Sequence, residues 1–153
     1  MRLVQVALVM SAVVLAAASI AGCSGESTAE AQQRCDLCGM RVDPSSGWRA
    51  GARDASGQAL AFDAPKCMFR RHFERGAISE PWVIEYYSQA RRPARELFFV
   101  IGTDLQGPMG RDLVPVAGRE AADRLLREHH GERVLAFDEV TREVVGTLFR
   151  RGS

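Results

Sequence analysis

The chain has 153 residues, of which a quarter are charged, and its formal net charge of +1 falls to about zero once Arg2 in the leader is set aside. A neutral chain without a basic tract gives no electrostatic reason to expect binding to nucleic acid. About 130 residues remain after the leader, which suits one compact domain whose hydrophobic core needs no disulfides.

The first 22 residues form an apolar leader. One basic residue, Arg2, precedes a long apolar run and then small residues, as in a signal peptide that is removed from the mature protein. The run is also long enough for a retained membrane span. Its ending, IAGC at residues 20–23, resembles the lipobox of bacterial lipoproteins. That resemblance implies that residues 1–22 are a lipoprotein signal peptide and that acyl chains on Cys23 hold the protein to a membrane.

A polar segment follows the leader. Residues 24–34, SGESTAEAQQR, lack hydrophobic periodicity, so we expect residues 23–34 to be a lipidated cysteine with a flexible tether. The folded domain is then expected over residues 35–153, facing the periplasm or the cell exterior. An aspartate directly after the lipidated cysteine often signals retention in the inner membrane. This chain has Ser24 at that position instead, which favours the outer membrane.

Strands and helices are expected to alternate along the domain. Asp63 can cap a helix over residues 64–75, with Pro65 in its first turn and Gly76 just past its end. Residues 118–131 predict a second, amphipathic helix closed by Gly131. Strands are predicted at residues 48–53, 58–62, 82–88, 96–102, 112–117 and 132–137. The mixture predicts an α+β fold.

Two short sequences recur in the two halves of the domain. LAFDAP at residues 60–65 returns as LAFDEV 75 residues later, and CGM at residues 38–40 is followed by PMG after 69 residues. Two matches at similar offsets predict a duplicated β-β-α-type unit, with halves of about 35–80 and 81–153. The halves would face each other and place Met40 and Met109 at equivalent ends.

Three cysteines follow Cys23, an odd number that leaves at least one thiol free or bound to something in a secreted protein. Cys35 and Cys38, in CDLCGM, have a spacing shared by zinc sites, redox motifs and copper sites. Cys67 lies near the start of the first expected helix, where the helix dipole favours thiolate. Helical geometry places it about 160° from the apolar stripe that contains Phe69. We therefore expect Cys67 to lie outside the core, as a candidate ligand.

Methionine distinguishes copper from zinc, because thioether ligands select monovalent copper. Met40 is two residues from Cys38, and Met109 lies in QGPMGRD, a glycine-rich loop that offers a methionine little packing. Met68 lies beside the apolar stripe and is assigned to the core. The candidate ligands for Cu(I) are Cys38, Met109, Met40, Cys35 and Cys67.

Two other functions use the same cysteines. A structural zinc site would combine Cys35, Cys38 and Cys67 with one histidine, from among His72, His129 and His130. A thiol-disulfide oxidoreductase would use the CxxC pair alone. The sequence contains no GxSxG, HExxH or glycine-rich phosphate loop, so no other enzyme class is indicated, and we expect the protein not to be an enzyme.

The order and spacing of five motifs resemble those of the NosL family, membrane-attached lipoproteins associated with assembly of the copper centres of nitrous-oxide reductase. The motifs are IAGC, CxxCGM, FDAPKCMF, GPMG and REHHGERVLAFDE. The resemblance implies two related β-β-α-type units and a Cu(I) chaperone whose site includes Cys38 and Met109. It also implies delivery to a cuproenzyme, namely nitrous-oxide reductase or its membrane assembly complex. Some relatives have only the cysteine before Gly-Met, so the number of ligands stays open.

Overall fold

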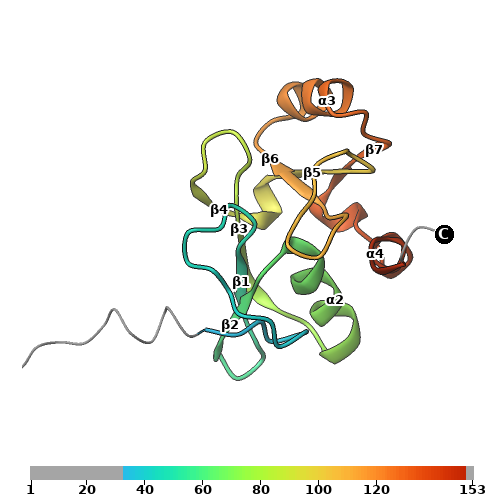
Figure 1. Cartoon of the computed structure of the whole chain (residues 1–153). Helices are drawn as coiled ribbons and strands as arrows, with labels where there is room; N and C mark the ends of the chain where they lie inside the picture. The colour runs from blue at the N-terminus through green and yellow to red at the C-terminus, as the bar shows by residue number, and fades with distance from the viewer. Residues whose placement is uncertain (1–32, 151–153) are drawn as a thin grey trace, which may run out of the picture.

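The computed structural model describes residues 33–150. The expected signal peptide, the lipidation site Cys23 and most of the expected tether lie outside the described residues. Within the described part, no helix is both long and apolar enough to cross a membrane. Two antiparallel sheets and three α-helices build this part of the chain, which confirms the expected α+β class (Figure 1).

The first sheet has the strand order β2-β1-β3-β4. Strands β1 (Ala50–Arg53) and β2 (Ala59–Phe62) form a hairpin, close to the ranges expected from the sequence. Its turn is stabilised by Asp54, whose carboxylate accepts hydrogen bonds from two backbone amides of the turn at 2.9 and 3.0 Å. Strand β3 (Ser79–Ile84) pairs with the other side of β1, and the short β4 (Arg91–Pro93) forms the edge.

The second sheet has the order β6-β5-β7, and one helix packs on it. Its strands are β5 (Phe98–Ile101), β6 (Val114–Val116) and β7 (Arg133–Ala136). Helix α3 (Arg119–Glu128) connects β6 to β7, as the sequence predicted. Two short 3-10 turns, η1 (Ala94–Glu96) and η2 (Phe137–Glu139), flank the sheet. The last helix of the described part is α4 (Arg142–Phe149), which was not predicted.

Each sheet forms one unit together with the helix that follows its second strand, α2 in the first unit and α3 in the second. Both units have the order strand, strand, helix, strand, and the first strand lies inside its sheet rather than at an edge. This supports the expected pair of related units, but the repeated letters are not equivalent in the fold. Residues 60–65 run from β2 into α2, whereas residues 135–140 run from β7 into η2. Met40 precedes β1, whereas Met109 lies between β5 and β6. The first sheet also continues to Pro93, past the expected division of the halves near residue 80.

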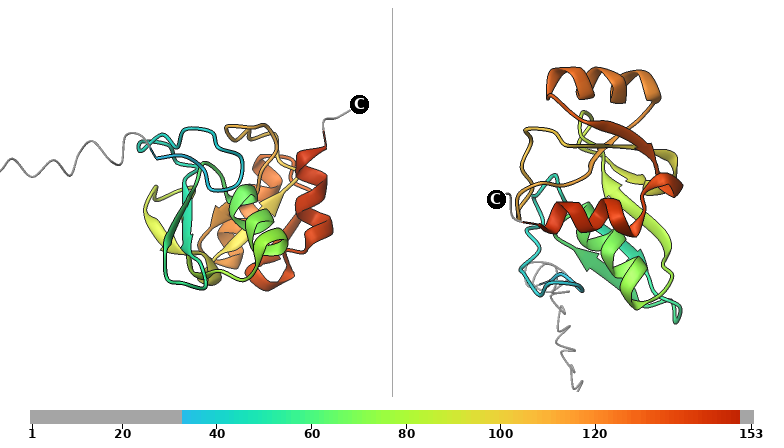
Figure 2. Two further views of the ribbon diagram at one scale, coloured as in Figure 1. Left: turned by 90° about the horizontal axis from the view of Figure 1, so that it is seen from below. Right: turned by 90° about the vertical axis from the view of Figure 1, so that its right-hand side faces the viewer.

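Helix α2 (Pro65–Arg75) contacts both units. Its Phe69 ring packs edge-on against Phe99 of β5, with centroids 5.1 Å apart, and against Phe137 at 4.9 Å. Successive side chains of β5 point to opposite faces of the sheet. Phe99 lies in the main core with α2, whereas Val100 belongs to a smaller cluster beneath α3. Helix α4 lies beside α2 (Figure 2). The start of α2 can therefore meet loops from both units.

Candidate metal centre

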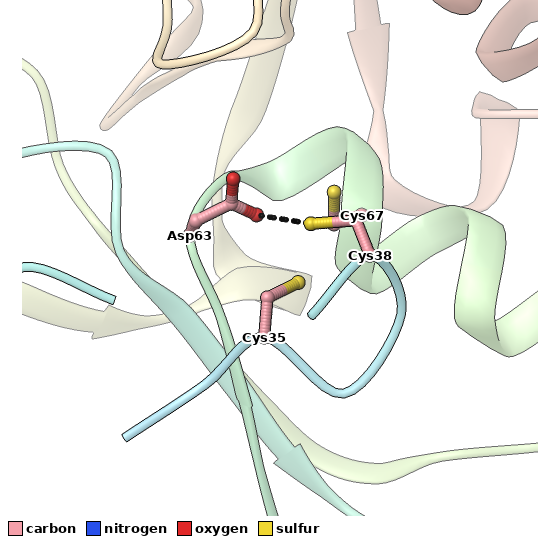
Figure 3. Close-up of side chains that lie close together, drawn as sticks. All are labelled: Cys35, Cys38, Asp63 and Cys67. Atoms are coloured by element: carbon pink, nitrogen blue, oxygen red, sulfur yellow. Dashed lines mark hydrogen bonds between the residues drawn. The ribbon is translucent and has the colours of Figure 1, made fainter. Parts of the chain in front are cut away.

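Four side chains converge at the start of α2: Cys35, Cys38, Asp63 and Cys67. One potential ligand atom from each lies within 4.8 Å of all the others (Figure 3). They come from three segments, namely the loop before β1, the residue after β2, and the first turn of α2. Three thiols and a carboxylate at this spacing form a potential metal site.

The loop of residues 35–40 is a tight turn fixed to the first sheet. The Cys35 amide donates to the Met40 carbonyl at 2.8 Å, and the Gly39 amide donates to the Cys35 carbonyl at 2.9 Å. Gly39 has a φ of +76°, which favours glycine. Asp36 attaches the loop to β2, because its amide donates to Ala61 at 2.9 Å and its carboxylate accepts from the Ala61 amide at 2.5 Å. This anchoring holds the two loop thiols at the start of α2.

The site is buried on one side and open on the other. Cys35 and Asp63 are each 3% exposed and Cys67 is 0% exposed, whereas Cys38 is exposed. The expectation that Cys67 lies outside the core was wrong. Helix α2 packs against both sheets and α4, so it has no single apolar stripe, and the side away from Phe69 is also covered. Whether Cys67 ligates a metal stays a prediction.

Asp63 does not cap α2 as expected. The cap position is taken by Ala64, whose backbone is extended, and no side chain of that residue caps the helix. One carboxylate oxygen of Asp63, Oδ1, instead accepts a hydrogen bond from the Cys38 thiol at 3.7 Å. The other, Oδ2, is buried with no hydrogen-bond partner among the described residues, which is costly for a polar atom. Asp63 is thus a further potential ligand that sequence reasoning assigned to the helix cap.

The three thiols differ in their readiness to ionise. A hydrogen bond from the Cys67 thiol, helped by backbone amides, lowers the pKa of Cys35 to about 6 despite its burial. The same hydrogen bond and burial raise the pKa of Cys67. Partial burial, together with the neighbouring Cys35, raises the pKa of Cys38 to about 11. Among the three thiols, Cys35 is therefore the one that ionises most readily.

A titration of thiolate absorbance in the reduced, metal-free protein should detect the Cys35 thiolate. One group should ionise near pH 6, because Cys67 stabilises the Cys35 anion. Cys67→Ala should move that midpoint upward, since it removes the donor. Cys38→Ala serves as the control and should leave an acidic midpoint in place. Ionisation of every thiol at the ordinary value for cysteine would contradict this arrangement.

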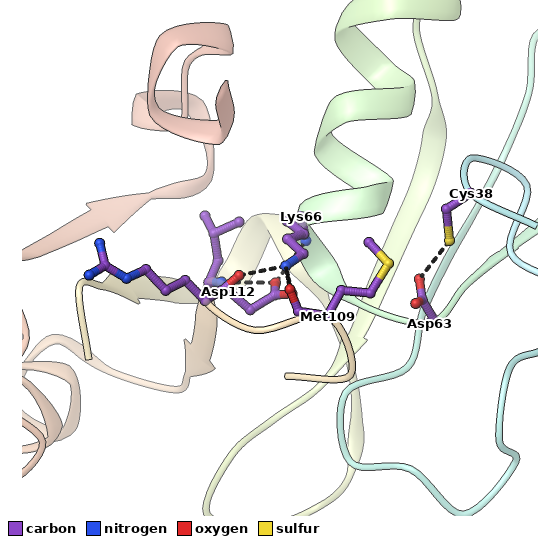
Figure 4. A network of polar contacts seen from close by, with 7 residues as sticks. Cys38, Asp63, Lys66, Met109 and Asp112 are labelled. Carbon is purple, nitrogen blue, oxygen red and sulfur yellow. Dashed lines mark hydrogen bonds and ion pairs between the residues drawn. The ribbon is translucent and has the colours of Figure 1, made fainter. Parts of the chain in front are cut away.

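Met109 approaches the cluster from the second unit. Gly107 and Gly110 pair through two backbone hydrogen bonds of 2.8 and 3.1 Å, which leaves Pro108 and Met109 at the tip of the β5–β6 loop. The Met109 side chain is half-buried and packs against the core cluster that contains two of the thiols. It extends toward Cys38 and Asp63 (Figure 4). The structure thus brings Met109 to the open side of the cysteine cluster.

Met40 is in a different position from Met109. Its side chain is 41% exposed, although its backbone closes the loop that carries the thiols. A ligand role for Met40 stays a prediction.

The histidines lie away from the cluster in the described part of the chain, residues 33–150. His72 accepts a hydrogen bond from the Ile78 amide at 3.3 Å. His129 contacts the Asp104 carboxylate at 2.9 Å and the Tyr86 hydroxyl at 3.3 Å. The alternative zinc set of three cysteines and a histidine is therefore not assembled among these residues, and the fourth group of the cluster is Asp63.

The sequence model of the NosL family matches residues 26–145, a span that includes the four clustered residues and Met109. The chain belongs to the NosL family. A search of curated proteins found no match. Among solved structures, the crystal structure of the copper chaperone NosL from Shewanella denitrificans is similar, with a TM-score of 0.66 and 20% sequence identity. The similarity covers 74% of this chain and 92% of that chain, so both share the NosL fold.

Proposed function

We propose that this NosL-family protein is a Cu(I) chaperone rather than an enzyme. The observation that carries the proposal is the cluster of three thiols at one half-open site, toward which the Met109 side chain extends from the other unit. A thioether beside thiolates favours Cu(I), because zinc sites draw on thiolate, imidazole and carboxylate ligands. The naming of the Shewanella denitrificans relative as a copper chaperone supports the same metal.

Cys35 is buried whereas Cys38 is exposed, and this difference suits transfer of the ion better than its storage. The buried Cys35, whose pKa is lowered most, is the thiol best prepared to supply a thiolate to the arriving ion. The exposed Cys38 releases a proton when it binds Cu(I), because only the thiolate is a ligand. A ligand from a partner can reach the ion from this open side before Cys38 leaves. The ion then moves by ligand exchange, without a change in oxidation state.

The recipient that we propose is a cuproenzyme, nitrous-oxide reductase or its membrane assembly complex. The family membership supports this partner. A lipid anchor at Cys23 would hold the protein on the outward side of a membrane, in our proposal the outer membrane. Such an anchor raises the effective concentration near membrane-bound partners.

Zinc binding is the second candidate function, and Asp63 favours it. Three cysteines and a carboxylate form a four-ligand set that zinc also accepts. In that case the ion would be structural and Met109 would have no role. The metal preference therefore decides between a chaperone and a structural site.

Anaerobic titration with Cu(I) against a competing chelator tests the proposed function. The reduced protein should bind about one Cu(I) per monomer and remain folded when the copper is removed. Oxidation of Cys35 and Cys38 to a disulfide should abolish tight binding. A structural zinc site predicts copurified zinc and unfolding on chelation. A thiol-disulfide oxidoreductase predicts catalytic turnover without any metal.

Met109→Leu should weaken Cu(I) binding by at least about tenfold, since even residues that only support metal ligands have effects of this size. Leucine keeps the apolar volume but removes the thioether. Met68→Leu is the matched control, because Met68 is fully buried in the core and should bind no metal. Chelator competition measures both variants. Equal affinities for the two variants would show that Met109 is not a ligand.

A further inference from the structure

Lys66 is the single lysine in a chain with nineteen arginines, and it is completely buried. It occupies the second position of α2, directly before Cys67. A buried ammonium group is costly unless hydrogen bonds and an opposite charge compensate for its lost hydration. The contacts of this group therefore indicate why a lysine is placed here.

The Lys66 ammonium group binds the loop that carries Met109. Its Nζ donates to the Met109 carbonyl at 2.8 Å and to the Arg111 carbonyl at 2.7 Å (Figure 4). The Asp112 carboxylate lies 3.7 Å away, which makes it an ion-pair partner but is too long for a hydrogen bond. The Phe149 ring of α4 covers the ammonium group, with its centroid at 5.3 Å. These polar partners all belong to one loop.

Asp112 completes the connection from the other direction. Its Oδ1 accepts hydrogen bonds from the backbone amides of Lys66 and Leu113, both at 2.9 Å. The Lys66 amide is in the first turn of α2, where amides lack partners within the helix. Asp112 thus supplies the cap that Asp63 does not, and it does so from the opposite unit. Two separate sets of hydrogen bonds therefore join the start of α2 to the Met109 loop.

These hydrogen bonds hold together two segments that carry candidate ligands, one from each unit. Cys67 follows Lys66 on α2, whereas Met109 lies at the tip of a loop narrowed by paired glycines. A hydrogen bond to the Met109 carbonyl fixes the backbone of the candidate ligand itself. Lysine suits this task better than arginine, because its donors radiate from one nitrogen that fits between two carbonyls.

We propose that Lys66 and Asp112 are positioning residues that hold the Met109 thioether at the cysteine cluster. Neither residue touches the ion. The inference rests on the proposed function, because it assigns these residues to one ligand of the Cu(I) site.

A double-mutant cycle with Met109 tests this role. The variant K66L/D112N removes both charges, while leucine keeps apolar volume without adding a thioether and asparagine keeps the oxygen that accepts the two backbone amides. In the protein with Met109, K66L/D112N should weaken Cu(I) binding about tenfold, the scale seen for residues that support metal ligands. In the Met109→Leu protein, it should change affinity by less than about twofold, because the positioned ligand is already missing.

The double-mutant cycle distinguishes failure of the positioning role from failure of the proposed Met109 ligation. Equal losses in both backgrounds would overturn the positioning role and leave Met109 as a ligand. If Met109→Leu alone left the affinity unchanged, the proposed thioether ligation and the positioning role would both be overturned.

A metal-free measurement gives a second, independent test. In protein labelled at its methionine methyl groups, NMR should show the Met109 methyl in a distinct environment. K66L/D112N should move that resonance toward the position of an unstructured methionine, while the buried Met68 methyl stays close to its original position and reports an intact core. A Met109 resonance unaffected by K66L/D112N would overturn the proposal.

Discussion

Cys38→Ser should weaken Cu(I) binding by about a hundredfold or more, because a soft thiolate ligand is replaced by a hydroxyl that Cu(I) does not favour. Cys38 is the exposed member of the cluster, so its replacement creates no cavity in the core. The free energy of unfolding of the metal-free protein should therefore stay close to that of the unmodified chain. Chelator competition measures the affinity, and denaturant unfolding provides the control.

The same pair of measurements shows why Cys38 is the most informative cysteine. Cys67 is fully buried and lowers the pKa of the neighbouring Cys35, so its replacement changes packing, ionisation and ligation together. At Cys38, a large loss of affinity with unchanged stability can be assigned to ligation. Unchanged affinity after Cys38→Ser would contradict the proposed Cu(I) site.

Lys66→Met alone should reduce the free energy of unfolding by about 3–5 kcal/mol, the cost of breaking a buried ion pair by removing one partner. It leaves Asp112 buried without its cation, and both side chains are at most 1% exposed. Denaturant unfolding at fixed pH measures the loss. Adding D112N should recover much of it, since no buried charge then remains.

The loss from Lys66→Met should depend on pH. Burial raises the pKa of Asp112 to about 7, although Lys66 opposes the increase, so removal of Lys66 should raise it further. A carboxyl group whose pKa is raised by folding adds stability that is fully present below its ordinary pKa and is lost as pH rises through the folded pKa. The variant should therefore be closer to the unmodified protein at about pH 5 than at about pH 8. A loss independent of pH would contradict the buried, unpaired Asp112 carboxylate.

The sequence predicted the elements with clear hydrophobic periodicity and missed two without it. The hairpin of β1 and β2 and the helices α2 and α3 lie close to their expected ranges. Strand β4 is only Arg91–Pro93, so no apolar alternation marks it, and it is an edge strand in which charge and proline are tolerated. Helix α4 contains Gly146 and β-branched residues, which weaken its helical signal.

The candidate site was predictable only as far as local motifs reach. CDLCGM and GPMG identified thiols and a thioether that the fold does bring to one region. The partner of Asp63 is Cys38, 25 residues away, so its place in the cluster depends on how the first loop folds back on β2. The Lys66 and Asp112 pair spans 46 residues and two units. Sequence reveals only that this lysine is unique.

X-ray absorption at the copper edge of the Cu(I)-loaded protein tests the central claim most directly, because it counts the sulfur atoms bound to the ion. Copper held between the cysteine cluster and Met109 should be surrounded by sulfur, and Met109→Leu should remove one sulfur neighbour while Met68→Leu removes none. Nearest neighbours that are mainly nitrogen or oxygen, or a sulfur count that Met109→Leu leaves unchanged, would contradict a Cu(I) site shared by the two units.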